Sequence, residues 1–263
     1  MEKLEHELWI VQAVNAALGP VVAAAMRALG RAVPAHGNII PDYIVMAGVI
    51  VAAWTIVCLL VRSRLSVDNP GQLQIAFEDG ISALLSMLHD YVGDKGIRYL
   101  PIVATMAVFI LTGNLMGLVP GLKSPTANIN VTLGCALTVA VYYHIQGVKT
   151  QGVGAYLKHF AAPPGAPLFI APIMLPIEII SHLSRVLSLS LRLFGNIFGE
   201  DLVILILFSI IPFLVPLPMM FLGIITASLQ AFIFVLLTTI YLGGAVATEH
   251  EHHEHGEMVA GEV

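Results

Sequence analysis

The chain has 263 residues, and its 12 Lys and Arg against 17 Asp and Glu give a formal net charge of −5. Hydrophobic residues make up 57% of it, charged residues only 11%, and the mean hydropathy is +0.87. Because a soluble domain carries about a quarter charged residues, this composition indicates an integral membrane protein. The negative charge excludes a basic nucleic-acid-binding protein, and two cysteines exclude a disulfide-dense scaffold.

The N-terminal segment, residues 1–42, is predicted to be amphipathic or interfacial. Its apolar stretch from Leu8 to Leu29 is interrupted by Gln12 and Asn15. Three acids before residue 8 do not suit the positively charged start of a secretory signal peptide. We therefore expect a helix lying at the membrane surface.

Three apolar stretches of spanning length follow, at 43–61, 99–119 and 131–148. The polar connection from 63 to 98 carries apolar residues at steps of three and four, which predicts a second helix on the membrane surface. Arg62, Arg64, Lys95 and Arg98 flank this connection. By the positive-inside rule it faces the cytoplasm, which places the N-terminus outside.

The last third of the chain predicts two long helices, 177–211 and 219–247, separated by a Pro-rich turn. At 1.5 Å per residue they measure about 50 Å and about 43 Å, longer than a bilayer core of about 30 Å. Such helices must tilt strongly. The expected fold is an all-α integral membrane protein with about five crossing helices in residues 43–248, and the last two form a tilted hairpin. The His- and Glu-rich tail, 249–263, then lies in the cytoplasm as a solvated segment, with metal binding as the alternative.

Ionisable residues inside the penultimate helix are costly in a membrane, at roughly 2.5–3.5 kcal/mol each, and therefore indicate function. With Arg192 set to zero and about 100° per residue, five further polar residues fall within about 40° of it. They are Glu178, Ser181, Arg185, Ser188 and Asn196. Asp201 falls at about 180°, while His182 and Glu200 fall at about 80°.

The residue types assign different roles along this helix. Arg192 is a permanent cation and cannot relay a proton, whereas Glu178, Asp201, Glu200 and His182 can each take and release one. Since Arg192 has no acid within one turn of its helix, we expect its counter-charge on another chain. On the last helix, Gln230 shares a face with Gly223, Thr226 and Tyr241, which suits packing against the first helix.

These residues resemble the signature of subunit a of F-type ATP synthases. The similar segments are Ser188-Leu-Ser-Leu-Arg192-Leu-Phe-Gly-Asn196 with the acidic pair after it, Ser228-Leu-Gln230-Ala-Phe-Ile-Phe with Tyr241-Leu, Asn114-Leu-Met-Gly-Leu-Val-Pro and Asn128-Ile-Asn130-Val-Thr-Leu. The resemblance runs from about Tyr43 to the end of the last helix.

The resemblance implies a non-catalytic stator subunit, with the last two helices packed against a proteolipid c-ring. Arg192 would be the essential Arg, with Asn196 and Gln230 supporting the surface that faces the ring. Glu178 and Ser181 would belong to the cytoplasmic half-channel and Asp201 to the outer one, with His182 and Glu200 as further proton-carrying candidates.

The same resemblance implies the surroundings of the subunit. Further partners would be the b subunits of the peripheral stalk, the remaining synthase subunits and the lipid bilayer. The location would be a bacterial inner membrane, and neither a cofactor nor a resident metal is expected. The coupling ion, H⁺ or Na⁺, stays open.

Three positions depart from the family pattern. Gly223 stands where some members carry a His that cooperates with the outer acid, and Gly117 and Asn128 stand where some carry Asp. Asp201 would then work without the His, with Glu200 as a possible aid.

Two alternative functions stay open at this point. A proton-coupled secondary transporter predicts an internal repeat and broken helices, and the long Pro-free helix argues against it. A metal permease predicts His and acid ligands clustered inside the spans, where only His144 and His182 are histidine candidates.

Overall fold

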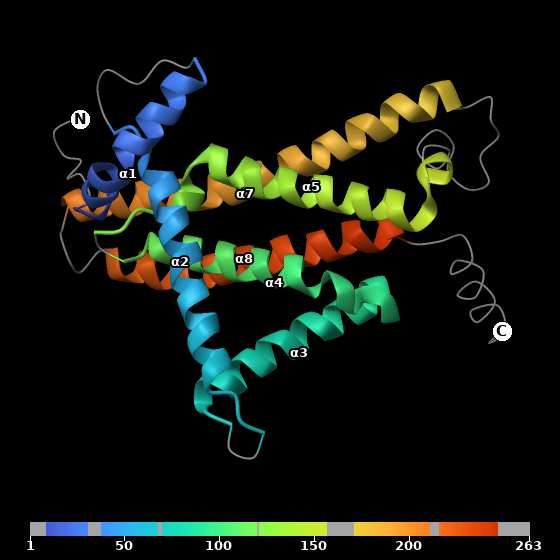
Figure 1. The fold of residues 1–263 in the computed structure, drawn as a ribbon, viewed down its shortest axis with the longest axis horizontal. Helices are drawn as coiled ribbons and strands as arrows, with labels where there is room; N and C mark the ends of the chain where they lie inside the picture. Colours follow the sequence, from blue (N-terminus) through green and yellow to red (C-terminus); the bar gives the residue numbers. More distant parts are fainter. Residues whose placement is uncertain are drawn as a thin grey trace. The chain divides into compact units, whose positions relative to one another are not determined.

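The computed structural model describes residues 9–30, 38–67, 70–119, 121–156, 171–210 and 216–246. Within these ranges the secondary structure is helical, with no β-strand (Figure 1). The helices are α1 (Trp9–Ala28), α2 (Asp42–Ser63), α3 (Gln72–Val92), η1 (Asp94–Tyr99), α4 (Leu100–Met116), η2 (Pro125–Ala127), α5 (Ile129–Gln151), α7 (Ala171–Ile210) and α8 (Pro216–Val246). The tail 249–263 lies outside the described residues.

Six of these helical segments are long and apolar enough to cross a membrane, which confirms the all-α membrane fold. Five of them coincide with the predicted spans. The sixth is α1, with a mean hydropathy of 1.6 over its most apolar stretch, which we expected to lie at the surface. The predicted number of five crossings is therefore approximate. By contrast α3, the other predicted surface helix, is not among the candidate spans.

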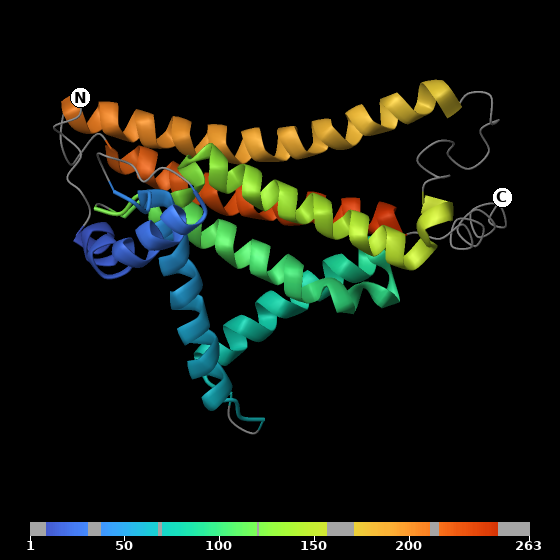
Figure 2. The ribbon, with the colours of Figure 1, turned by 45° about the horizontal axis from the view of Figure 1, so that its top comes forward.

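The long helix α7 begins earlier than predicted, at Ala171 instead of residue 177, and Pro176 therefore lies inside it. Proline removes a single hydrogen bond, to the carbonyl of residue 172, and this loss falls close to the N-terminus, where the first four N–H groups have no helical partner anyway. Figure 2 shows α7 as one continuous helix. Its 40 residues measure about 60 Å at 1.5 Å per residue.

The start of α8 was also predicted too late. Pro216 and Pro218 form its first turn instead of the preceding loop. This position suits them, since proline needs no N–H partner there and its backbone angle already fits the helix.

The chain divides into two compact units, and α4, α5, α7 and α8 each contribute one part to each unit. Unit 1 comprises Met1–Gln74, Val108–Thr132 and Leu193–Ala231; unit 2 comprises Ile75–Ala107, Leu133–Arg192 and Phe232–Val263. The boundary on α7 falls directly after Arg192.

In unit 1 an apolar cluster joins α1, α2 and α4. Val11, Met46 and Ile50 are its most buried members, with 0%, 0% and 3% of their surface exposed. The Asn15 side chain binds the backbone of Ile40 in both directions, which ties α1 to the residues before α2. Trp54 of α2 donates a hydrogen bond to Thr112 Oγ1 of α4 at 2.8 Å.

In unit 2 the end of α3 packs against α8 at a glycine. A Cβ at Gly243 would overlap the backbone carbonyl of Tyr91, so only glycine permits this approach. Further along α8, Gln151 of α5 donates a hydrogen bond to the carbonyl of Ala245 at 3.0 Å. These contacts hold α3, α5 and α8 together in unit 2, which also contains the polar cluster around Glu178 described below.

Candidate functional site on the polar face of α7

The buried side of α7 is apolar and adjoins its predicted polar face. Leu189, Leu193 and Ile197 recur every four residues and are 3%, 0% and 2% exposed. On the polar face, Arg192 and Asn196 are exposed, and Ser181 is half-buried. The chain therefore buries one side of α7 and leaves the side around Arg192 uncovered.

Arg192 forms no ion pair with any acid in the part of the chain that the structure describes. The uncovered side of α7 around it also carries exposed apolar residues: Leu191 is 55% exposed and Leu187 46%. A permanent cation among exposed apolar residues is expensive in a bilayer unless an opposite charge meets it. This observation agrees with the predicted counter-charge on another chain.

Asn196 and Gln230, two of the predicted site residues, are in direct contact. The Asn196 amide donates a hydrogen bond to Gln230 Oε1 at 2.9 Å, which joins α7 to α8 within unit 1. Gln230 is 2% exposed, and its Nε2 has no hydrogen-bond partner among the described residues. This hydrogen bond thus fixes the side-chain amide of Asn196, and the buried Nε2 of Gln230 can still donate a hydrogen bond to another group.

The adjacent acids Glu200 and Asp201 lie against two glycines, one on α8 and one just after α4. The Glu200 carboxylate packs on Gly223 of α8, where a Cβ would overlap Glu200 Oε1. The Asp201 carboxylate faces Gly117, just after α4, and a Cβ there would lie 3.1 Å from Asp201 Oδ1. Two of the three departures from the family pattern therefore make room for the adjacent carboxylates.

A cavity of about 250 Å³ opens beside Glu200 in unit 1. Asn196, Gly199 and Glu200 line it from α7, and Gly223 and Thr226 line it from α8. Glu200 Oε1 is buried and has no hydrogen-bond partner in the described part of the chain. Buried carboxylate oxygens are normally hydrogen-bonded, so this one is available to a proton or to water.

A buried hydroxyl network shapes the loop beside Asp201. Thr126 donates to Asn114 Oδ1 at 2.7 Å, and Ser124 donates to the carbonyl of Gly113 at 2.8 Å. Asn114 in turn donates to the carbonyl of Ala227 at 3.3 Å. Ser124 also adjoins Gly117, since a Cβ there would lie 3.0 Å from the Ser124 Cβ. The network joins α4, the loop and α8.

Asn128, the third departure, is part of a helix start. Its side-chain oxygen accepts a hydrogen bond from the backbone N–H of Asn130 at 3.0 Å, and its carbonyl accepts one from Thr132. An Asn in this position satisfies N–H groups of the first turn of α5. Asn128 therefore has a local structural role.

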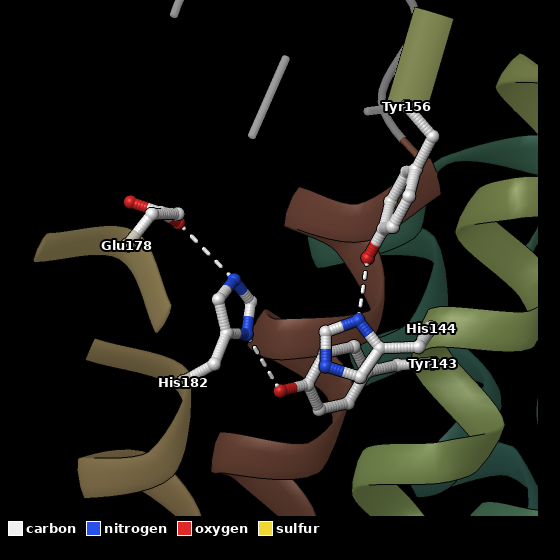
Figure 3. A network of polar contacts seen from close by, with 5 residues as sticks. All are labelled: Tyr143, His144, Tyr156, Glu178 and His182. Carbon is white, nitrogen blue, oxygen red and sulfur yellow. Dashed lines mark hydrogen bonds and ion pairs between the residues drawn. The ribbon is translucent and has the colours of Figure 1, made fainter. Parts of the chain in front are cut away.

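Glu178 belongs to a polar cluster in unit 2. Its carboxylate lies 3.1 Å from His182 Nε2, and His182 Nδ1 lies 2.8 Å from the Tyr143 hydroxyl (Figure 3). The side chain of His182 is 15% exposed and that of Glu178 36%. The structure thus pairs two predicted proton-carrying residues, and α5 supplies the third member.

Two further residues complete this inner cluster. His144 Nδ1 lies 2.6 Å from the Tyr156 hydroxyl, and the rings of His144 and His182 are 4.8 Å apart between centroids. Nearby, the guanidinium of Arg185 lies over the ring of Tyr241 at 5.1 Å. Sequence reasoning considered His144 only as a metal ligand and missed Tyr143 and Tyr156. The signal for Tyr143 and His144 is that these adjacent polar residues lie inside an otherwise apolar span.

The described residues bear on both alternative functions. No group of three or more His, Cys, Asp or Glu in them is arranged to hold a metal ion, whereas a metal permease predicts such a group. Over their described lengths, α7 and α8 are unbroken, whereas a secondary transporter predicts helices interrupted near the membrane centre.

The chain is similar to a known protein family over most of its length. The family model described as ATP synthase A chain matches residues 43–243. A protein named ATP synthase subunit a from Geotalea daltonii is 46% identical over 209 residues, which cover 80% of this chain and 89% of the relative. The protein of that name from Geobacter sulfurreducens is 45% identical over 217 residues, covering 80% and 93%.

The match includes α4, α5 and α7 in full, nearly all of α2 and α8, and with them every predicted site residue. The chain belongs to the ATP synthase A chain family.

Proposed function

We propose that this chain is the proton-channel stator subunit in the membrane sector of an ATP synthase. Family membership supports the general role, because the relatives are named as subunit a of ATP synthase. The finer proposal assigns the chain two half-channels, one on each side of Arg192. The subunit neither makes nor breaks a covalent bond of a substrate. It moves protons between acids and lets a ring of proteolipids turn.

The exposure of Arg192 carries this proposal. A guanidinium on the uncovered side of α7, with no acid paired to it among the described residues, suits a passing carboxylate of a ring subunit. The pair would form only while that carboxylate is ionised, since Arg stays charged and attracts the anion alone. Arg192 therefore makes each carboxylate release its proton before it passes.

The positions of the acids support two separate half-channels. Glu178 lies 14 residues before Arg192 and Asp201 nine residues after it on the same helix, about 21 Å and about 14 Å along its axis. Ser181 and His182 accompany Glu178, whereas Glu200 accompanies Asp201. A proton from one half-channel is thus taken up by a ring carboxylate on one side of Arg192. A proton leaves a ring carboxylate into the other half-channel on the opposite side of Arg192.

Partners and orientation follow from this role. The polar face of α7, with Asn196 and Gln230 beside it, would face the c-ring, and other surfaces would meet the b subunits and lipid. The chain would lie in a bacterial inner membrane with its C-terminus in the cytoplasm. If residues 1–42 lie at the interface, the N-terminus is outside; a crossing by α1 would move it to the cytoplasm.

The test is ATP-driven acidification of inverted membrane vesicles that contain the whole synthase, with Arg192→Ala against wild type. We expect the complex to assemble and pumping to fall at least about 100-fold, because the passing carboxylate loses its only fixed counter-charge. Arg62→Ala, an exposed Arg near the end of α2, is the matched control and should pump normally. Normal pumping by an assembled Arg192→Ala complex would refute the role.

A further inference from the structure

The inner cluster contains more proton-accepting groups than Glu178 alone. Five side chains of unit 2 converge there, from α5, α7 and the helical residues 153–156 that follow α5 (Figure 3). They are Tyr143, His144, Tyr156, Glu178 and His182. Three are hydrogen-bonded in sequence, and the other two form a hydrogen-bonded pair directly beside them.

His182 is held so that a proton can enter at one nitrogen and leave from the other. With Glu178 ionised, His182 donates its Nε2–H to the carboxylate and accepts the Tyr143 hydroxyl at Nδ1. A proton delivered to Nδ1 lets the Nε2 proton pass to Glu178. The ring then ends neutral with its hydrogen on Nδ1, and Glu178 ends as the uncharged acid. One proton has entered and one has moved on.

His144 is the second imidazole of the cluster, and Tyr156 orients it. Burial raises the pKa of the Tyr156 phenol above its usual value of 10.0, and the Glu178 carboxylate raises this pKa further. Tyr156 therefore stays protonated, and its hydroxyl can donate to His144 Nδ1 or accept from it, depending on the tautomer of the ring. When the hydroxyl donates, the neutral ring carries its own hydrogen on Nε2. In either case this hydrogen bond holds the His144 ring in position.

The two imidazoles lie close enough to influence each other. Their centroids are 4.8 Å apart, and the Tyr143 ring lies against both, at 4.4 Å from His144 and 5.7 Å from His182. A proton on one ring disfavours a second proton on the other, because like charges repel. Among the described residues, the charged or titratable groups that face the two imidazoles, besides Tyr143 and Tyr156, are Glu178 and Arg185 of α7 and Tyr241 of α8.

We propose that His144 is a second proton-accepting residue of the half-channel that contains Glu178, and that Tyr143 and Tyr156 are the positioning residues of the two imidazoles. This inference rests on the proposed function and extends it. The two rings share one added proton, so the half-channel takes up or releases protons through a cluster instead of through a single acid.

A glycine of α5 preserves the arrangement. A Cβ at Gly147 would lie 2.5 Å from the ring of Tyr156 and 2.9 Å from the carbonyl of Ala245. The Tyr156 ring therefore lies directly on the backbone of α5, one turn after His144. This close contact fixes the position from which its hydroxyl reaches His144.

The test measures passive proton conduction through the membrane sector of inverted vesicles after the catalytic sector has been removed. A potassium diffusion potential drives the protons, and the pH of the medium, which bathes the cytoplasmic face, is varied. The variants are Tyr156→Phe, His144→Gln and Tyr143→Phe. Tyr142→Phe is the matched control, because this neighbouring tyrosine stacks edge-on with Tyr99 outside the cluster. Co-purification with the ring checks assembly.

We expect Tyr143→Phe and His144→Gln to lower conduction about threefold and Tyr156→Phe about twofold. All three should also change the shape of its dependence on medium pH, whereas Tyr142→Phe should do neither. A purely structural role would lower conduction by one factor at every pH, and that result would overturn the proposal. Tyr156→Phe loses a single hydroxyl, so it keeps the test decisive if His144→Gln fails to assemble.

The result separates this proposal from the proposed function. If the three variants conduct like Tyr142→Phe while Arg192→Ala abolishes coupled pumping, the stator role stands and the cluster proposal is wrong. If Arg192→Ala pumps normally, the stator role fails whatever the cluster variants show.

Discussion

The two acid sites of the molecule are built in different ways. In unit 1 the carboxylates of Glu200 and Asp201 lie against Gly223 and Gly117, and Glu200 Oε1 has no hydrogen-bond partner among the described residues. In unit 2 the carboxylate of Glu178 is hydrogen-bonded to His182, which in turn reaches Tyr143. Glu200 and Asp201 are thus placed by available space, whereas Glu178 is placed by polar contacts.

This difference predicts that different substitutions impair the two acid sites. A site placed by space fails when a side chain fills that space, although its own chemistry is unchanged. A site placed by hydrogen bonds tolerates the loss of one member when others can still accept a proton. The predictions below test these two statements, beginning with the largest expected effect.

The first prediction concerns Gly223. Gly223→Val should lower ATP-driven proton pumping at least about tenfold, because its Cβ overlaps the Glu200 carboxylate and overpacking of this kind costs about 1–3 kcal/mol. The measurement is vesicle acidification at matched levels of assembled synthase. Gly134→Val is the control, since a Cβ at Gly134 of α5 meets nothing within 4 Å.

A second variant sharpens this prediction. Shortening the acid should relieve the clash, so Glu200→Ala combined with Gly223→Val should assemble better than Gly223→Val alone. Additive losses in the double variant would contradict the close contact of the two positions, because residues in contact are expected to couple.

The second prediction compares the acids directly. Asp201→Asn should lower passive proton conduction more than Glu178→Gln does, by about tenfold against about threefold. Both changes keep the size of the side chain and remove its titration. Beside Glu178, however, His182 and His144 remain to accept a proton. Equal losses would show that the inner cluster offers no alternative acceptor.

Sequence reasoning predicted most of the helices, because apolar stretches of spanning length are a strong signal. It misplaced the starts of α7 and α8, since Pro176, Pro216 and Pro218 were interpreted as helix breakers. A proline near a helix N-terminus removes few or no hydrogen bonds, so a Pro alone does not tell a break from a first turn. The choice for α1 between surface and crossing likewise cannot be made from apolarity alone.

The candidate site was predictable only along α7 itself. A period of 3.6 residues placed Glu178, Ser181 and Asn196 on the side of Arg192. The hydrogen bond between Asn196 and Gln230 was not predicted and comes from the structure. The tyrosines of the cluster could not be predicted as partners, because Tyr143 lies 39 positions from His182, which it binds, and no periodicity relates α5 to α7. Contacts between helices depend on packing, which single-helix patterns do not contain.

The third and smallest prediction concerns the hydroxyl network that shapes the outer site. Thr126→Val keeps the shape of the side chain and removes its hydrogen bonds to Asn114 and Ser124. Leaving a buried acceptor unpaired costs about 1–3 kcal/mol. We expect the solubilised synthase to release this subunit at a lower temperature, whereas pumping at low temperature falls less than twofold. Thr138→Val is the control, because Thr138 is exposed and binds only its own helix. A large loss of pumping without a loss of stability would instead mean that the Thr126 hydroxyl takes part in proton transfer, and that hydrogen bonds as well as space govern the outer site.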